Sequence, residues 1–167
     1  MRIKSTHTMT KLKNPYASIP GYSCFGCSPT NPFGLRMEFF LEGDEIVCRW
    51  DPSEHYQGFH DILHGGIQAT LMDEIASRVV FMMLDTAGMT YQLNTRFRKP
   101  VLISKGIITV RATLLRQQKR IAEIEARLYD GEDMLCAKSQ ANYFILPREK
   151  AVKELHFPGK EAFLNQT

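Results

Sequence analysis

The segment from residue 67 to residue 84 constrains the fold of this chain more than any other part of the sequence. Apolar residues recur in it at helical spacing: Ile67, Leu71, Ile75, Val79, Met82 and Met83. The other faces of this helix are also mostly apolar or small, so we expect it to be buried nearly all round. A single helix buried in this way needs a sheet that curls around it. The segment therefore predicts an α+β domain in which a curved sheet wraps one long buried helix.

Strand-like segments with alternating apolar and polar residues lie on both sides of the predicted helix. They cover residues 35–41, 46–50, 89–99, 107–116, 121–129 and 135–146. Gly43 and Asp44 form a turn that makes the first two segments a hairpin. The turns around Gln117 and around Asp130 and Gly131 are short, so we expect the last three segments to form an antiparallel meander.

The length of 167 residues suits one domain with a full hydrophobic core. We expect an N-terminal extension over 1–22, the folded domain over 23–147, and a charged tail with a short surface helix over 148–167. The net charge of +3 is too small to indicate nucleic-acid binding. No apolar run approaches the ~20 residues of a membrane span, and residues 1–13 lack the apolar core of a signal peptide. We therefore expect a cytoplasmic protein without nucleic-acid or membrane partners.

Cysteine usage does not indicate a disulfide framework. Of the four cysteines, Cys48 and Cys136 lie in strand-like segments, where we expect them to be reduced and half-buried. Cys24 and Cys27 have the spacing of a metal knuckle. They supply only two of the four ligands of a structural zinc site, and no further pair follows at zinc-site spacing. We expect a structural loop here and no metal.

The predicted helix starts with two adjacent glycines, Gly65 and Gly66, which follow His64. Glycine is a poor helix former, so the pair indicates a requirement of backbone geometry. It also leaves the first amides of the helix uncovered, and free N–H groups at a helix start bind anions or carbonyl oxygens. In acyl transfer such a donor forms an oxyanion hole. Tight packing explains two glycines about as well.

Asp73 is an acid on a helix whose other residues are overwhelmingly apolar. Its helical neighbours are small and carry no positive charge, so no local ion pair accounts for it. The adjacent Glu74 differs, because Arg78 follows it four residues later and supplies an ordinary structural partner. An acid without a local partner on a small-residue patch of a buried helix favours a functional group that faces a cavity. A bond to a distant backbone amide is the alternative.

The spacing of Gly65 and Asp73 bears on the oligomeric state. Eight residues along a helix at ~1.5 Å per residue separate the two by about 12 Å, whereas a carbonyl carbon and its attacking water lie within roughly 3–3.5 Å of each other. One subunit can hardly place both groups on one thioester. If both are catalytic, we expect the site to be shared between two helices that lie side by side in a dimer.

Several motifs resemble those of hotdog-fold thioesterases of the phenylacetate-degradation type. His64, Gly65 and Gly66, with Leu71 and Asp73 after them, look like the signature of this family. Two further segments resemble the family's upstream loop and the strand after its helix: Cys24, Phe25, Gly26 and Cys27 with residues 31–35, and then Thr90, Leu93, Asn94, Phe97 and Pro100. The match runs from about residue 24 to residue 146. It implies a curved antiparallel sheet around the long helix and a dimer with the active site at its interface.

The resemblance assigns four catalytic roles. Asp73 corresponds to the catalytic carboxylate, acting as general base on water or as nucleophile, and the Gly65 amide to the donor that polarises the carbonyl. His64 would orient the substrate or the loop, although it could simply cap the helix. Thr90 matches a Ser or Thr position that holds the water or the carboxylate. One departure is Gly58, where some relatives have Asn, so their acyl preference cannot be carried over.

The expected activity is hydrolysis of an acyl-CoA thioester by a homodimer or homotetramer, without a cofactor other than the CoA of the substrate. Further substrate-binding candidates are Gly66, Gly58, His60, Asn94, Arg96 and Arg98, the two arginines as contacts of the CoA phosphates. Two alternatives stay open. A hotdog hydratase or dehydratase also pairs a His with an acid, and a non-catalytic acyl-CoA-binding protein could use the same fold. The sequence does not reveal the acyl group.

Overall fold

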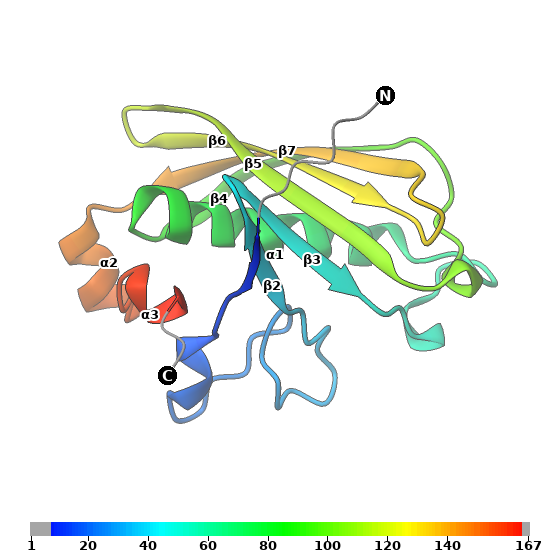
Figure 1. Ribbon diagram of the computed structural model, residues 1–167, viewed down its shortest axis with the longest axis horizontal. Helices are drawn as coiled ribbons and strands as arrows, with labels where there is room; N and C mark the ends of the chain where they lie inside the picture. The colour runs from blue at the N-terminus through cyan, green and yellow to red at the C-terminus, as the bar shows by residue number, and fades with distance from the viewer. Residues whose placement is uncertain (1–7, 165–167) are drawn as a thin grey trace.

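The computed structural model describes residues 8–164 as one antiparallel sheet with a long helix packed against it (Figure 1). The seven strands are β1 (Met9–Lys11), β2 (Phe39–Glu42), β3 (Glu45–Trp50), β4 (Gly88–Phe97), β5 (Ile108–Gln118), β6 (Ile121–Tyr129) and β7 (Leu135–Ile145), in the sheet order β1-β2-β3-β5-β6-β7-β4. The helices are α1 (Gly65–Leu84), α2 (Arg148–Leu155) and α3 (Glu161–Leu164), with 3-10 turns at Pro15–Ser18, Glu54–Tyr56 and Ile103–Lys105.

The hairpin and the meander predicted from the sequence are both present. β2 pairs with β3, and β5, β6 and β7 follow one another in antiparallel order. β4 pairs with β7 and forms an edge of the sheet, although it directly follows α1 in the chain. The first strand predicted from the sequence, over 35–41, is present as β2, which begins only at Phe39. The amides of Leu35 and Met37 instead donate to the carbonyls of Phe25 and Gly26, at 2.7 and 2.9 Å, and so tie this segment to the preceding loop.

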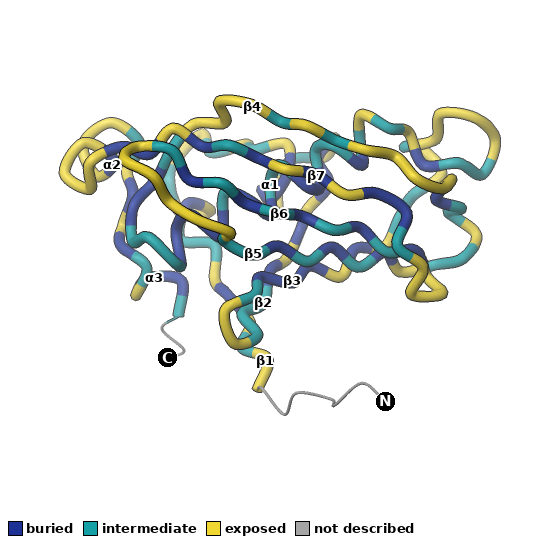
Figure 2. Tube along the Cα trace, turned by 90° about the horizontal axis from the view of Figure 1, so that it is seen from above, coloured by how far each residue is buried: buried dark blue, intermediate teal, exposed yellow. Residues whose placement is uncertain are grey.

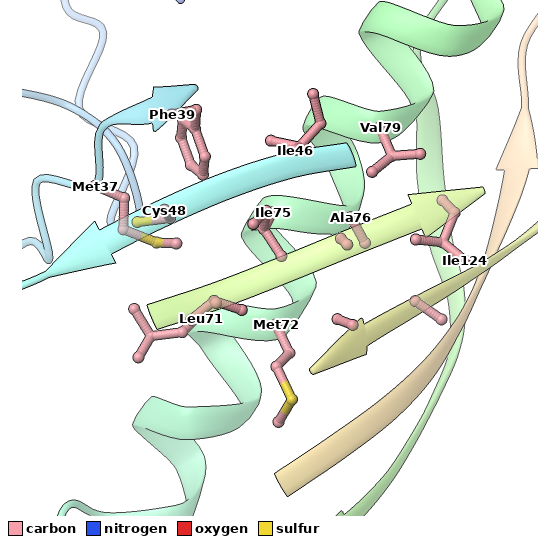
Figure 3. Packing of buried hydrophobic residues seen from close by; sticks show 14 of the residues in the cluster. Met37, Phe39, Ile46, Cys48, Leu71, Met72, Ile75, Ala76, Val79 and Ile124 are labelled. Atoms are coloured by element: carbon pink, nitrogen blue, oxygen red, sulfur yellow. The ribbon is translucent and has the colours of Figure 1, made fainter. Parts of the chain in front are cut away.

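The hydrophobic core lies between α1 and the concave face of the sheet (Figure 3). Leu71, Ile75 and Val79 of the helix are fully buried, and Ile46 and Ile124 of the sheet face them. Small inward residues on β5, β6 and β7 leave room for the helix backbone: Ala112, Ala122, Ala126, Ala137 and Ala141. This packing is the curved sheet around a long helix that the apolar segment predicted.

A strip along α1 is less buried than its composition suggested. Gly66 is exposed, and Thr70, Asp73 and Ser77, which follow it at helical spacing, are only half-buried. The sheet covers one side of the helix, and this strip lies at the border of that side, where Asp73 contacts Thr90 of β4. The neighbouring strand β4 is mostly exposed along its length (Figure 2). The partly exposed strip of α1 and the exposed strand β4 therefore lie next to each other in the single chain.

The segments near both chain ends pack against the rest of the domain, as β1, α2 and α3 show. β1 adds to the sheet beside β2, and Leu12 and Tyr16 are buried in the core. The predicted helix in the charged tail is present as α2, and Phe157 and Phe163 after it are buried against Phe81. Leu12 and Tyr16 thus belong to the hydrophobic core, and the division of the chain into extension, domain and tail stays a prediction. Residues 1–7 and 165–167 lie outside the described part of the chain.

Among residues 8–164, no helix combines the length and the apolar character that crossing a membrane requires.

Candidate active site

The start of α1 is capped by His64. The imidazole Nδ1 accepts a 2.9 Å hydrogen bond from the Gly66 amide, and the His64 carbonyl accepts from the amides of Ile67 and Gln68. An imidazole that accepts at Nδ1 carries its proton on Nε2. Added side-chain atoms at Gly66 would lie 3.1 Å from this ring, so the second glycine permits the cap. The capping role considered from the sequence is thus confirmed, and contact of His64 with substrate stays a prediction.

The hydrogen bonds of the His64 cap do not use the Gly65 amide. Within residues 8–164, no acceptor pairs with this N–H, which lies at the positive end of a twenty-residue helix. Gly65 is half-buried, and a Cβ there would lie 3.5 Å from the Phe97 ring. The start of α1 therefore lies beside the tip of the Phe97 ring, and its free N–H is of the kind that binds anions and carbonyl oxygens.

Asp73 is held by two hydroxyl groups from different strands. Thr90 on β4 donates to Asp73 Oδ1 at 2.8 Å, and Tyr143 on β7 lies 2.9 Å from the same oxygen. The Tyr143 hydroxyl is also 2.8 Å from the backbone carbonyl of Asp73. Thr90 and Tyr143 oppose each other in the β4–β7 register, so both hydroxyls reach the helix at one level. In the described part of the chain Oδ2 has no partner and is available to a water molecule or a substrate.

Tyr143 is the functional residue that sequence reasoning missed. It is 3% exposed, and burial followed by the negative charge of Asp73 holds the pKa of its hydroxyl far above the usual value. The group therefore stays protonated, and its one proton is shared between the carboxylate and the backbone carbonyl of Asp73. The signal in the sequence is weak: a tyrosine between Ala141 and Ile145 on the inward face of the last strand, where the other inward residues are mostly apolar.

Gly65 and Asp73 do not meet in one chain. Both lie on α1, eight residues apart, which is about 12 Å along a helix. A hollow of about 360 Å³ opens at the start of this helix and is lined by His55, Tyr56, Gln57, His64, Gly66, Ile67 and Thr70. A larger cavity of about 790 Å³ lies between β1 and the loop before β2, at Leu12, Met37 and Phe39, away from Asp73. The cavity of about 790 Å³ and Asp73 are thus separate.

The predicted substrate-binding residues fall into two groups. Gly58 and His60 lie in the exposed loop before α1, where a Cβ at Gly58 would be 3.5 Å from the His64 Cα. Asn94 and Arg96 oppose Gln140 and Lys138 across the β4–β7 ladder. Opposed residues share a face of the sheet, and these partners are exposed, so Asn94 and Arg96 point away from α1. Arg98 is exposed just beyond β4. The single chain does not bring these three residues to Asp73.

Glu74 and Arg78 of α1 form a separate polar group on another side of the helix. Glu74 pairs with Arg78 at 3.3 Å, as the sequence predicted. The loop before β2 adds Cys24 and Cys27, so that the two thiols and the Glu74 carboxylate are close enough to share a metal ion. The sequence pattern could not reveal this grouping, because Glu74 is distant from the cysteines in the chain.

The comparisons with known proteins identify the family of this chain. Residues 60–137 match the family described as the thioesterase superfamily. The curated protein "Putative esterase Ta0293" of Thermoplasma acidophilum is 31% identical over 112 residues, which are 66% of this chain and 83% of that protein. The chain belongs to the thioesterase superfamily. Membership of this family supports a thioester hydrolase in general terms, while the phenylacetate-type subgroup stays a prediction.

Solved structures of thioesterase-superfamily proteins share the fold. One protein of this superfamily superposes with a TM-score of 0.63 at 22% identity, over 70% of this chain and 57% of that chain. A hypothetical thioesterase from Streptococcus pneumoniae, solved with coenzyme A, superposes with a TM-score of 0.58 at 19% identity, over 63% of this chain and 83% of that chain. The curved antiparallel sheet around α1 is therefore the hotdog fold that the resemblance predicted.

Proposed function

We propose that this thioesterase-superfamily chain hydrolyses an acyl-CoA thioester to the free acid and CoA. The observation that supports the proposal is the environment of Asp73. Its carboxylate Oδ1 accepts hydrogen bonds from the hydroxyls of Thr90 and Tyr143, while Oδ2 has no partner within residues 8–164. The unpaired Gly65 amide supplies a carbonyl donor of the kind that acyl transfer requires. CoA itself is bound in a solved structure of the same fold, which supports the choice of thioester.

The chemistry needs two groups on opposite sides of the thioester carbonyl. Asp73 acts as general base: it takes a proton from water as the water oxygen bonds to the carbonyl carbon. The Gly65 N–H stabilises the oxyanion that forms, and the C–S bond then breaks to release CoA as a thiolate, which is protonated. Direct attack by the Asp73 carboxylate, followed by hydrolysis of an anhydride, is the alternative for the first step.

The two groups act together when a second copy lies beside the first. The half-buried strip of α1 carries Thr70, Asp73 and Ser77, small side chains that allow another helix to approach. The adjacent strand β4 has an unpaired edge with Met89, Tyr91 and Phe97 between 50% and 68% exposed. Pairing of two β4 edges would cover both features. It would place Asp73 of one subunit near the partner's Gly65, and we propose this homodimer as the active form.

Substitution of Tyr91 by Asp is expected to weaken the dimer and to reduce activity in proportion. The exposed ring lies on the free edge of the sheet, and a dimer axis through β4 would bring two new carboxylates close together. Sedimentation velocity measures the dimer fraction, and thiol release measures turnover. Tyr91→Phe is the matched control and should keep both values. A fully dimeric Tyr91→Asp protein would contradict an interface at this edge.

Substitution of Tyr143 by Phe is expected to lower kcat by about one to two orders of magnitude, since hydrogen bonds to charged groups contribute ~1.5–3 kcal/mol. The phenyl ring keeps the core filled, whereas Asp73 Oδ1 loses one of its two donors. The hydroxyl-bearing control is Thr90→Ser, which keeps a donor on β4 and should stay within a few-fold of the wild type. An unchanged kcat in Tyr143→Phe would show that this hydroxyl does not position the carboxylate.

One assay separates the proposed hydrolase from the alternatives. Thiol release is followed with aryl, short-chain and long-chain acyl-CoA esters, and crotonyl-CoA is included to detect hydration of the double bond. Release of CoA from at least one ester, lost in Asp73→Asn, supports the hydrolase. Hydration of crotonyl-CoA without thiol release would favour a hydratase instead. Tight binding with neither reaction across the panel would identify a non-catalytic acyl-CoA-binding protein.

A further inference from the structure

A group of side chains that could hold a metal ion lies where the loop before β2 meets α1, on a different side of the helix from Asp73. Its members are Cys24 and Cys27, from the loop before β2, and Glu74 of α1, and we call them the Cys–Glu cluster. One ligand atom from each residue lies within 4.8 Å of the others. We propose that this cluster binds one thiophilic divalent metal ion of the zinc type, which fastens the loop to α1.

The spacing of the donor atoms is compatible with a shared ion. Cys24 Sγ lies 3.7 Å from both carboxylate oxygens of Glu74, a distance at which the thiol donates to the carboxylate when no ion is bound. Zinc bonds of about 2.3 Å to sulfur and about 2.0 Å to oxygen, at a tetrahedral angle, set these two ligands ~3.5 Å apart. The observed separation is therefore close to an edge of a zinc tetrahedron.

The loop that carries the two thiols is held over Glu74 by its own backbone. The Ser28 amide donates to the Cys24 carbonyl at 3.1 Å, which closes a turn around the pair. Gly26 lies at the tip of this turn, where a Cβ would be only 2.6 Å from the Glu74 carboxylate. A larger residue at this position would require the Glu74 side chain or the loop to shift, so glycine allows the observed approach.

Arg78 provides the outer support that a thiolate-rich site needs. Its guanidinium is 3% exposed, lies over the rings of Phe39 and Phe81, and donates to Cys27 Sγ at 2.8 Å and to Glu74 at 3.3 Å. Hydrogen bonds to metal ligands orient them and tune the site. Two thiolates, one carboxylate, one guanidinium and one divalent ion sum to zero charge. The bound state therefore leaves no uncompensated charge in this buried region.

The cluster is also accessible to an ion and leaves room for a fourth ligand. A hollow of about 460 Å³ reaches Cys24, Glu74 and Arg78 from the surface and is bordered by Tyr22 and His156. Three protein ligands with a water in the fourth position are a common zinc arrangement. Binding would release the two thiol protons, as metal binding to cysteines does.

The test uses the full-length protein, freed of metal by a chelator and kept reduced. Co²⁺ is titrated first, because thiolate coordination gives sulfur-to-cobalt charge-transfer absorption, and Zn²⁺ is then added in competition. We expect one Co²⁺ per chain with charge-transfer bands that Zn²⁺ abolishes. Cys24→Ser and Glu74→Gln should each weaken Zn²⁺ binding by more than about tenfold. Cys136→Ala, a buried cysteine outside the cluster, is the matched control and should bind as the wild type does.

Thermal unfolding supplies a readout that does not depend on enzymatic activity. Saturating Zn²⁺ should raise the Tm of the wild type and of Cys136→Ala, and should leave that of Cys24→Ser nearly unchanged, since an ion that binds the native state stabilises it. Cys24 is half-exposed, so its serine variant should fold, which the unfolding curve without metal verifies. Failure of the wild type to bind one ion, or wild-type affinity in both cluster variants, would overturn the proposal whatever the thioesterase assay shows.

Discussion

Replacement of Asp73 by Asn is expected to lower kcat by about 10²–10⁴-fold, the usual contribution of a general base. Asn is nearly the same size, and its side-chain oxygen can still accept from Thr90 and Tyr143. The fold should therefore survive while the ability to accept a proton from water is lost. Steady-state thiol release with the best acyl-CoA measures kcat, and circular dichroism with thermal unfolding verifies the fold.

The control for this substitution is Asp44→Asn, which neutralises an exposed aspartate in the turn between β2 and β3. It should leave kcat within a few-fold of the wild type. An Asp73→Asn protein that keeps near-wild-type turnover would rule out both the base and the nucleophile role of this carboxylate. A loss that accompanies unfolding would instead indicate a structural role for the Asp73 contacts.

Removal of the Gly65 amide hydrogen is the second large effect, with an expected loss of about 10²–10³-fold in kcat, as for other oxyanion-hole donors. Gly65→Pro removes this N–H and adds the pyrrolidine ring. Gly65 is the first residue of α1, where proline is well tolerated. The preceding His64 has ψ 134°, in the range that proline imposes on its neighbour. No bond within residues 8–164 uses this amide.

Gly65→Ala is the matched control, because it adds a methyl group but keeps the N–H. The added Cβ would lie 3.5 Å from the Phe97 ring, an ordinary van der Waals contact. We expect the alanine variant to retain most of its turnover, so the difference between the two variants isolates the hydrogen-bond donor. Equal loss in both would mean that space beside Phe97, and not the amide, is what the site requires.

The sequence predicted the elements that follow from local patterning. The apolar period located α1, alternation located β3 to β7, and short turns fixed the meander. β1 escaped detection because three residues show no period, and it forms through pairing with β2 about thirty residues away. The burial of Phe163 also depends on contacts with Tyr16 and Phe81, which no local pattern encodes.

The same difference between local patterns and contacts of distant segments applies to the candidate site. Asp73 stood out because a helix of apolar residues gives an acid no local partner. The family resemblance predicted that Thr90 holds the water or this carboxylate, and Thr90 contacts the carboxylate. Tyr143 lies seventy residues from Asp73, and only the β4–β7 register brings its hydroxyl to the carboxylate. The orientation of Arg96 likewise depends on the bulge between Thr90 and Gln92, which shifts the alternation of β4. A local pattern cannot predict this shift.

Subunit complementation tests the shared site most directly. Asp73→Asn and Gly65→Pro proteins are each nearly inactive alone, and they are mixed under conditions that allow the subunits to exchange. In a mixed dimer one of the two sites combines an intact Asp73 with the partner's intact Gly65. Random exchange should therefore restore about a quarter of wild-type activity. No recovery, in a mixture shown to contain mixed dimers, would contradict a site built from both subunits.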